Sequence, residues 1–314
     1  MSRGRTASAA VLVLGLASLP GRSPVAAQAG TAPAGTKLEQ TISPGTNFDK
    51  ANFTLWYAQG TATFRAVVLL VPGSNGDGRP MVDDPFWQAF AASHQVALVG
   101  CQITDKPHDQ NFIEAYVNVS EGSGPAVLEA LAKLGDASKH PELARAPLLL
   151  WGMSAGGQFN YEFTAWKPDR VAAFIVNKGG IYYHALLSQA ARAVPGLLFT
   201  GEKDLASRIE TITGLFAVNR RGGAVWALVQ EPGATHVVGR SQEFGALFFD
   251  ELMPLRIAPD GTLKPLAGPG FVGDLTTRTY QPAAAPGTPG TPNVWLPTER
   301  IARAWQAVVT GQPF

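Results

Sequence analysis

The sequence predicts an α/β fold with a mostly parallel central sheet. Two observations indicate this class: short continuous apolar runs recur along the chain, and amphipathic helical patterns separate them. An apolar run of about five residues without alternation is typical of a strand that is buried on both faces, as in a parallel sheet. The runs lie at residues 66–71, 96–101, 147–151, 171–176, 196–199 and 225–229. Alternation of strand and helix favours parallel strands that are joined by crossover helices.

The chain before the first of these runs has a different pattern. Between residues 38 and 58 the apolar side chains alternate loosely with polar ones, as at Phe53, Leu55 and Tyr57. Alternation of this kind is typical of a strand with one buried face. We therefore expect an antiparallel pair of strands at the beginning of the fold.

Helical periodicity is visible between the apolar runs. Asp84 is a suitable N-cap, because Pro85 follows it at the position where a helix tolerates proline. Apolar stripes at a spacing of three or four residues predict the other helices. These stripes comprise Val127, Leu131 and Leu134; Phe159, Phe163 and Trp166; Ile209, Ile212 and Phe216; and Phe244, Leu247, Phe248 and Leu252. The helix that carries the first stripe is predicted to end at Gly135, and the helix that carries the third is predicted to end at the glycine pair at 222–223.

Residues 257–314 are expected to form an irregular extension that ends in a helix. Proline, glycine and threonine are frequent between residues 257 and 293, which is typical of loops. Thr298 is a suitable cap for a last helix that has Ile301, Trp305 and Val308 on one face. Because such an apolar stripe is unfavourable in water, we expect this helix to dock on the main core. Residues 28–314 are therefore interpreted as one domain.

The first 27 residues read as an export signal. Arg3 and Arg5 precede an apolar run that is too short to span a bilayer. Small residues before Ala27 are suited to signal peptidase, and Ala29 ends a second possible cleavage site. No later segment approaches the roughly 18 consecutive apolar residues of a membrane span. We expect a mature protein that is secreted or periplasmic.

Composition excludes several classes of function. The chain has 314 residues and a formal charge of +1, and its lysines and arginines do not cluster, so a nucleic-acid partner is not expected. Cys101 is the single cysteine, which excludes an intramolecular disulfide and a cysteine-rich zinc site. The metal motif H-E-x-x-H and the phosphate-binding P-loop are also missing from the sequence. Neither a metal nor a cofactor is expected.

The most informative motif follows the 147–151 run directly. Residues 152–156 read Gly-Met-Ser-Ala-Gly, and a helical pattern comes after them. At a strand-to-helix junction, this G-x-S-x-G spacing places a serine on a tight turn where the glycines avoid a clash with neighbouring backbone. The first amides of the helix would stabilise an oxyanion beside that serine. Ser154 is therefore the candidate nucleophile and the Ala155 amide a candidate oxyanion donor; a serine that only caps the helix is the alternative.

In these residues the sequence resembles the α/β-hydrolase superfamily, and more loosely its esterase and polyester-depolymerase-like branch. The resemblance covers roughly residues 38–255 and implies a triad in the order serine, acid, histidine. The implied acid lies a few residues beyond a later strand, where Asp204 stands, with Glu202 as its competitor. Asp204 could instead serve only as a helix cap. The implied histidine follows the last strand and matches His236.

The second oxyanion donor is expected in the Gly-rich loop after the first parallel strand. Relatives often carry His-Gly at this turn, and Pro72 replaces the histidine here, which leaves the register of the donor open. The candidates are the amides of Ser74 and Asn75. Candidate walls of the substrate site are residues near the ends of neighbouring strands, namely Trp151, Met153, Asn177, Lys178 and Tyr182.

These residues predict an exported serine hydrolase, most simply a carboxylesterase, that cleaves carboxylic esters through a Ser-His-Asp triad and an acyl-enzyme. Its expected partner is an ester substrate, either a small molecule or a polymer. A peptidase or amidase of the same fold remains an alternative, as does a polyester or feruloyl-ester hydrolase. A non-catalytic binding protein is a further one, since a fold does not guarantee a function.

Overall fold

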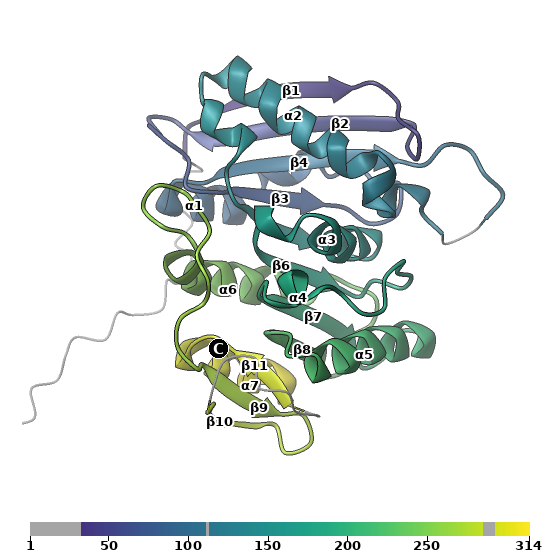
Figure 1. Cartoon of the computed structure of the whole chain (residues 1–314), viewed down its shortest axis with the longest axis vertical. Helices are drawn as coiled ribbons and strands as arrows, with labels where there is room; N and C mark the ends of the chain where they lie inside the picture. Colours follow the sequence, from purple (N-terminus) through teal and green to yellow (C-terminus); the bar gives the residue numbers. More distant parts are fainter. Residues whose placement is uncertain (1–32, 111–112, 285–292) are drawn as a thin grey trace, which may run out of the picture. The chain divides into compact units, whose positions relative to one another are not determined.

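An eight-stranded sheet forms the centre of the computed structural model, which describes residues 33–110, 113–284 and 293–314 (Figure 1). The order of the strands is β1-β2-β4-β3-β5-β6-β7-β8. The predicted export signal lies outside the described residues. Within the described ranges, no helix has the length and apolar character that crossing a membrane requires.

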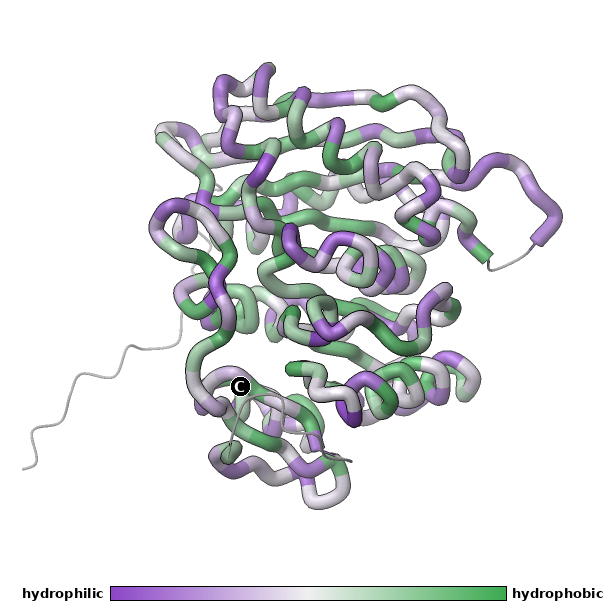
Figure 2. The backbone as a smooth tube through the Cα atoms, in the orientation of Figure 1, coloured by the Kyte–Doolittle hydropathy of each residue, from purple (hydrophilic) through white to green (hydrophobic). Residues whose placement is uncertain are grey.

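The parallel part of the sheet agrees with the predicted strands to within a few residues. It consists of β3 (Val67–Val71), β4 (Ala97–Thr104), β5 (Leu148–Gly152), β6 (Val171–Asn177), β7 (Gly196–Gly201) and β8 (Trp226–Glu231). The hydropathy colouring of these strands in Figure 2 is mainly hydrophobic. Both faces are covered by helices, which explains why each strand reads as a continuous apolar run. The predicted fold class is confirmed.

The predicted antiparallel pair consists of β1 (Gly35–Ile42) and β2 (Lys50–Ala58). β2 also pairs with β4 in the antiparallel direction, so it joins β1 to the parallel strands. The residues of β1 alternate between exposed and half-buried, as expected for a strand at the edge of a sheet.

Seven α-helices and five short 3₁₀ helices occur in the described residues. The α-helices are α1 (Pro85–His94), α2 (Ser123–Ser138), α3 (Ala155–Trp166), α4 (Gln189–Arg192), α5 (Ala206–Arg221), α6 (Ser241–Arg256) and α7 (Glu299–Val309). The 3₁₀ helices are η1 (Arg79–Asp83), η2 (Ala115–Val117), η3 (Val119–Glu121), η4 (Pro141–Ala144) and η5 (Pro168–Arg170). α2, α3 and α5 cover one face of the sheet, and α1 and α6 cover the other (Figure 1).

The predicted end of α2 at Gly135 is wrong, because the helix continues to Ser138. It ends where Lys139 takes a left-handed φ of 62°. The glycine has a packing role instead: a Cβ at this position would lie 3.0 Å from the carbonyl oxygen of His140. The following chain therefore packs tightly against this glycine, and the helix does not end at it.

Part of the segment that was expected to be irregular forms a second sheet. Its three antiparallel strands are β9 (Phe271–Asp274), β10 (Thr279–Pro282) and β11 (Asn293–Leu296), in the order β10-β9-β11. Strands of only four residues show too little alternation to be recognised from sequence. α7 packs against β8, and its buried Trp305 donates a hydrogen bond from Nε1 to the carbonyl oxygen of Leu228 at 2.9 Å.

A histidine links the two helices on one face of the sheet. His94 at the end of α1 lies with Nε2 2.9 Å from Oδ1 of Asp250 in α6. Burial alone would lower the pKa of this histidine, but the carboxylate of Asp250 and the carbonyl oxygen of Phe90 outweigh burial and raise the pKa. The folded protein therefore binds the proton of His94 more tightly than the unfolded chain does.

We expect His94→Gln to reduce the free energy of unfolding by about 0.5 to 1 kcal/mol at low pH and by less at high pH. A raised folded-state pKa stabilises the protein below the unfolded value of about 6.5, and this contribution is lost as the pH rises through the folded value. Urea unfolding of both proteins at about pH 5.5 and pH 8.5 measures the difference on either side of that value. An equal loss at both pH values would contradict a charged histidine here.

Candidate active site

Ser154 lies on the turn between β5 and α3 with φ 56° and ψ −124°. A residue other than glycine is rarely found in this region, and the surroundings must hold it there. The flanking glycines allow the turn: a Cβ on Gly152 would lie 2.4 Å from the carbonyl oxygen of Gly156, and one on Gly156 would lie 2.2 Å from that of Val71. The tight turn that the motif predicts is present, with the serine at its strained position.

Asp204 and His236 lie on the loops after β7 and β8 and are in direct contact. Nδ1 of His236 is 3.0 Å from Oδ2 of Asp204, whose side chain is 3% exposed. The other carboxylate oxygen accepts the N–H of Leu205 and contacts the guanidinium of Arg208. Burial would raise the pKa of Asp204, but these hydrogen bonds and the charge of Arg208 outweigh it, so the pKa is lowered. The carboxylate is thus available to hold the Nδ1 proton of the imidazole.

The three side chains come from loops at one edge of the sheet. Ser154 follows β5, Asp204 follows β7 and His236 follows β8, and these strands are parallel (right-hand edge of the sheet in Figure 1). In open α/β sheets this carboxyl edge is where ligands bind. Nε2 of His236 forms no hydrogen bond with any residue that the structure describes, Ser154 included. The structure therefore brings Asp204 and His236 into contact, and it places Ser154 at the same edge without a direct hydrogen bond to the histidine.

Glu202, the competitor for the acid, has a different partner. Its Oε2 accepts the N–H of Gly233 at 2.6 Å, at the beginning of the loop that carries His236. The geometry therefore favours Asp204 as the partner of the histidine and gives Glu202 a contact with the loop backbone.

The sequence leaves open which amide of the Gly-rich loop is the candidate oxyanion donor. The hydrogen bonds of the loop favour one of the two. The N–H of Asn75 donates to the hydroxyl oxygen of Tyr116 at 3.4 Å. The amides of Ser74 and Ala155 have no acceptor among the described residues. A Cβ on Gly73 would lie 3.6 Å from Cβ of Ser154, so this loop passes beside the serine. Ser74 is therefore the better candidate than Asn75.

The side chain of Asn75 holds this loop in place. It donates from Nδ2 to Oδ2 of Asp105 at 3.3 Å and accepts the N–H of the same residue at 2.7 Å. The other carboxylate oxygen of Asp105 accepts the N–H of Tyr116 at 3.1 Å. The backbone of Asn75 has φ 51°, which this short polar side chain tolerates better than most.

Three of the five predicted substrate walls are interior residues, and for these the prediction is corrected. Trp151 is buried, packs against Trp87 and donates from Nε1 to the carbonyl oxygen of Ser241. Asn177 and Lys178 are buried completely, and their polar atoms bind other groups of the protein. A side chain that is enclosed by the protein cannot form the wall of a substrate site.

Met153 and Tyr182 are partly exposed, so they remain candidates for contact with a substrate. The ring of Tyr182 packs edge-on against Tyr161 with centroids 5.0 Å apart. Its hydroxyl group is buried and has no hydrogen-bond partner among the described residues.

Sequence reasoning missed Arg208 and Asp105. Arg208 stands four residues after Asp204, so helical i,i+4 spacing could have indicated the ion pair. Asp105 meets Asn75 across 30 positions of the chain, and no pattern in the sequence indicates this contact. Among the described residues, no group of three histidine, cysteine or acidic side chains is arranged to hold a metal ion.

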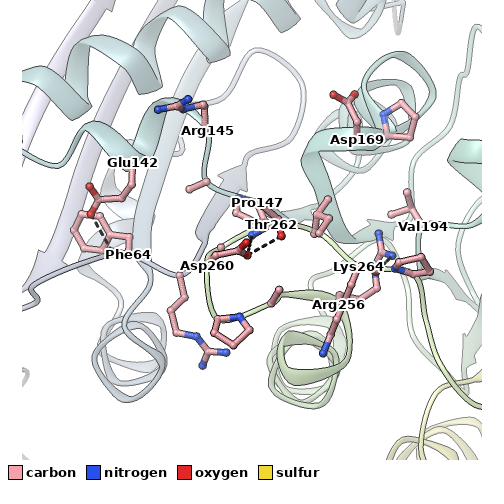
Figure 3. Close-up of a pocket in the computed structure, with 18 of the residues that line it drawn as sticks. Phe64, Glu142, Arg145, Pro147, Asp169, Val194, Arg256, Asp260, Thr262 and Lys264 are labelled. Atoms are coloured by element: carbon pink, nitrogen blue, oxygen red, sulfur yellow. Dashed lines mark hydrogen bonds between the residues drawn. The ribbon is translucent and has the colours of Figure 1, made fainter.

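A groove of about 1300 Å³ lies at the opposite edge of the sheet (Figure 3). Its walls include Arg65, Pro147 and Val194, which precede β3, β5 and β7, together with the segment at 258–265. The lining contains no serine, cysteine or histidine. This groove therefore lacks the serine and histidine of the proposed chemistry, and it is separate from the candidate active site.

The order of the strands in the large sheet is that of the α/β-hydrolase fold. Likeness to one solved structure, that of LpqC, supports this fold. LpqC, a poly(3-hydroxybutyrate) depolymerase from Bordetella parapertussis, matches with a TM-score of 0.52 and 17% identity, over 74% of this chain and 91% of that chain. FphF, a fluorophosphonate-binding serine hydrolase from Staphylococcus aureus, matches with a TM-score of 0.48 and 12% identity, over 70% of this chain and 99% of that chain. No protein-family model and no curated protein sequence matches.

Proposed function

We propose that the protein is a serine hydrolase that cleaves carboxylic esters. The observation that carries this proposal is the contact between Nδ1 of His236 and Asp204, at the sheet edge where Ser154 occupies a strained turn. A nucleophile, a base and a group that orients the base are the minimum set for this chemistry. The α/β-hydrolase fold of the chain is consistent with it.

Ester cleavage would proceed in two halves. Ser154 Oγ attacks the carbonyl carbon while Nε2 of His236 takes the hydroxyl proton, and the imidazolium then gives that proton to the departing alcohol. Water attacks the resulting acyl-enzyme by the same proton route, which releases the carboxylic acid and restores the serine. Asp204 holds the Nδ1 proton and stabilises the imidazolium. The amides of Ala155 and Ser74 would stabilise the oxyanion in both halves.

Exposed apolar side chains in the loops at this edge favour an apolar substrate. Leu205 comes directly after the proposed acid and is 62% exposed, and Val237 and Val238 come directly after the proposed base and are 46% and 38% exposed. Ile181 and Tyr183, in the loop after β6, are exposed as well. Grouped exposed apolar residues mark binding surfaces. An ester with an apolar acyl group fits them, and a polyester, the kind of substrate that the name of LpqC indicates, is the second candidate.

Labelling with a fluorescent fluorophosphonate tests the proposed class of enzyme. Only a serine that a neighbouring base activates reacts with this reagent. We expect a single label, which peptide mass spectrometry locates on Ser154. A panel of nitrophenyl esters with increasing acyl length, and a polyester film, would then separate the two kinds of substrate. A protein that stays unlabelled and inactive on every ester would contradict the proposal.

We expect kcat/KM to fall as the pH is lowered from neutral into the acidic range, as for an enzyme that uses a general base. Only a neutral imidazole can accept the Ser154 proton, while the lowered pKa of Asp204 keeps that group a carboxylate in this range. Initial rates down to about pH 4.5 measure this fall in kcat/KM, and circular dichroism is the control for folding. A flat profile with intact structure would refute a histidine base. EDTA should leave the profile unchanged, because no proposed step uses a metal.

We also propose that the protein acts outside the cytoplasm, since its first 27 residues have the composition of an export signal. N-terminal sequencing of the protein from a secreting host tests this proposal. A mature chain that begins near residue 28 is expected, and a chain that keeps residues 1–27 would contradict export.

A further inference from the structure

A buried polar cluster lies beside the candidate active site. It consists of Asn177 at the end of β6, Lys178 directly after it, and Glu231 at the end of β8. Lys178 is 0% exposed, and its Nζ forms an ion pair with Oε2 of Glu231. Removing two charges from water is costly, and an apolar pair of similar size is often more stable. None of these side chains takes part directly in the proposed reaction, so their placement needs another explanation.

Asn177 connects the serine turn to the loop of the histidine. Its carbonyl oxygen accepts the N–H of Ser154 at 2.7 Å. Its side chain donates from Nδ2 to the carbonyl oxygen of Val238 at 2.9 Å and to Oγ of Ser241 at 2.8 Å. Val238 stands two residues after His236, so one buried residue contacts both the nucleophile turn and the loop that carries the base.

Lys178 fixes the orientation of that amide. Its backbone has a left-handed φ of 58°, and its Nζ donates to Oδ1 of Asn177 at 2.9 Å. Because the ammonium occupies the amide oxygen, the amide nitrogen of Asn177 is directed towards the loop at 232–240. The ion pair with Glu231 compensates the charge of the buried ammonium.

Glu231 contacts both ends of the loop at 232–240. The residue itself stands immediately before the loop, and its Oε1 accepts the N–H of Arg240 at 2.5 Å. The carboxylate packs so closely that a Cβ on Gly239 would lie 2.3 Å from Oε1. On its other side the loop touches β7, where a Cβ on Gly201 would lie 2.5 Å from the carbonyl oxygen of Ala234.

We propose that Asn177, Lys178 and Glu231 are positioning residues, which hold the His236 loop in register with the Ser154 turn. This inference rests on the proposed function, because it assigns the cluster a role in aligning the nucleophile and its base. Proton transfer from Ser154 to His236 depends steeply on their geometry, and a displacement of about 1 Å can cost 100-fold in rate. Side chains that act only on stability would not alter this step in the folded enzyme.

The test compares Asn177→Leu with the matched control Asn219→Leu. Asn219 is also completely buried, and its amide nitrogen and oxygen bind backbone groups of α5 and of the segment at 185–187. Its amide nitrogen also donates to the hydroxyl group of Tyr161. Both variants lose buried hydrogen bonds, so both should have a lower Tm. For Asn177→Leu alone we expect kcat about 10- to 100-fold lower, with KM changed less than about threefold. The rate of fluorophosphonate labelling, measured on the folded fraction, should fall in parallel.

Each outcome of this comparison supports or overturns the positioning role. Equal kcat and equal labelling rates for the two folded variants would overturn the positioning role and leave the proposed function intact. A wild-type protein that is not labelled would overturn both. If Asn177→Leu does not fold, Ser241→Ala replaces it, since it removes one acceptor of the Asn177 amide and leaves the ion pair. A kcat at least about threefold lower in that variant supports the inference, and an unchanged kcat overturns it.

Discussion

Ser154→Ala is expected to lower kcat/KM for a short-chain nitrophenyl ester by about 10⁴-fold or more, while the protein stays folded. The side chain that is lost carries the proposed nucleophile, and alanine differs from serine only by the hydroxyl group. The strained backbone at φ 56° is held by the flanking glycines and by the bond to Asn177, which the substitution leaves in place. Steady-state kinetics and a thermal melt measure the two effects.

The control for this variant is Ser138→Ala, at the end of α2 and away from the site. Its activity should stay within about twofold of the wild type, as for most surface substitutions. If Ser154→Ala kept the wild-type rate, Ser154 would not be the nucleophile, whatever the fold.

Asp204→Asn is expected to lower kcat by about 10³- to 10⁴-fold. An amide in this position favours the wrong tautomer of His236 and no longer stabilises the imidazolium. The same change leaves Arg208 without its carboxylate partner, so a lower Tm is also expected. Kinetics on the folded fraction separate the catalytic loss from the loss of stability.

Glu202→Gln is the matched comparison, and we expect its kcat to fall by less than about fivefold. A glutamine oxygen can still accept the N–H of Gly233, which is the contact of Glu202 in the structure. If this variant proved more damaging than Asp204→Asn, the assignment of the acid would be wrong.

Local steric and periodic requirements made much of the fold predictable. The parallel strands are continuous apolar runs because both of their faces are buried, and each was found to within a few residues. The turn at Ser154 was predictable because only glycine fits at positions 152 and 156, where backbone atoms approach within 2.5 Å of a Cβ. The second sheet at 271–296 was not predictable, since its four-residue strands have no visible period.

The misassigned site residues show where reasoning from sequence ends. Asn177 and Lys178 follow a buried strand at the carboxyl edge, where polar side chains commonly face a ligand. The side chains of both residues point into the protein interior, because Glu231, more than 50 positions along the chain, compensates the charge of the lysine. Likewise, Ser74 is favoured over Asn75 only because Tyr116 accepts the other amide. Pairings across such separations leave no trace in spacing or composition.

The packing of the C-terminal segment on β8 has a consequence for solubility. β8 is the outermost strand of the large sheet, and one of its carbonyl groups, that of Leu228, accepts the indole N–H of Trp305. A bare outer strand offers its peptide groups to other chains and promotes aggregation. A chain shortened at residue 257 would keep every proposed catalytic side chain but uncover this strand, so it should associate with copies of itself. The C-terminal segment would then protect β8 from pairing with strands of other molecules.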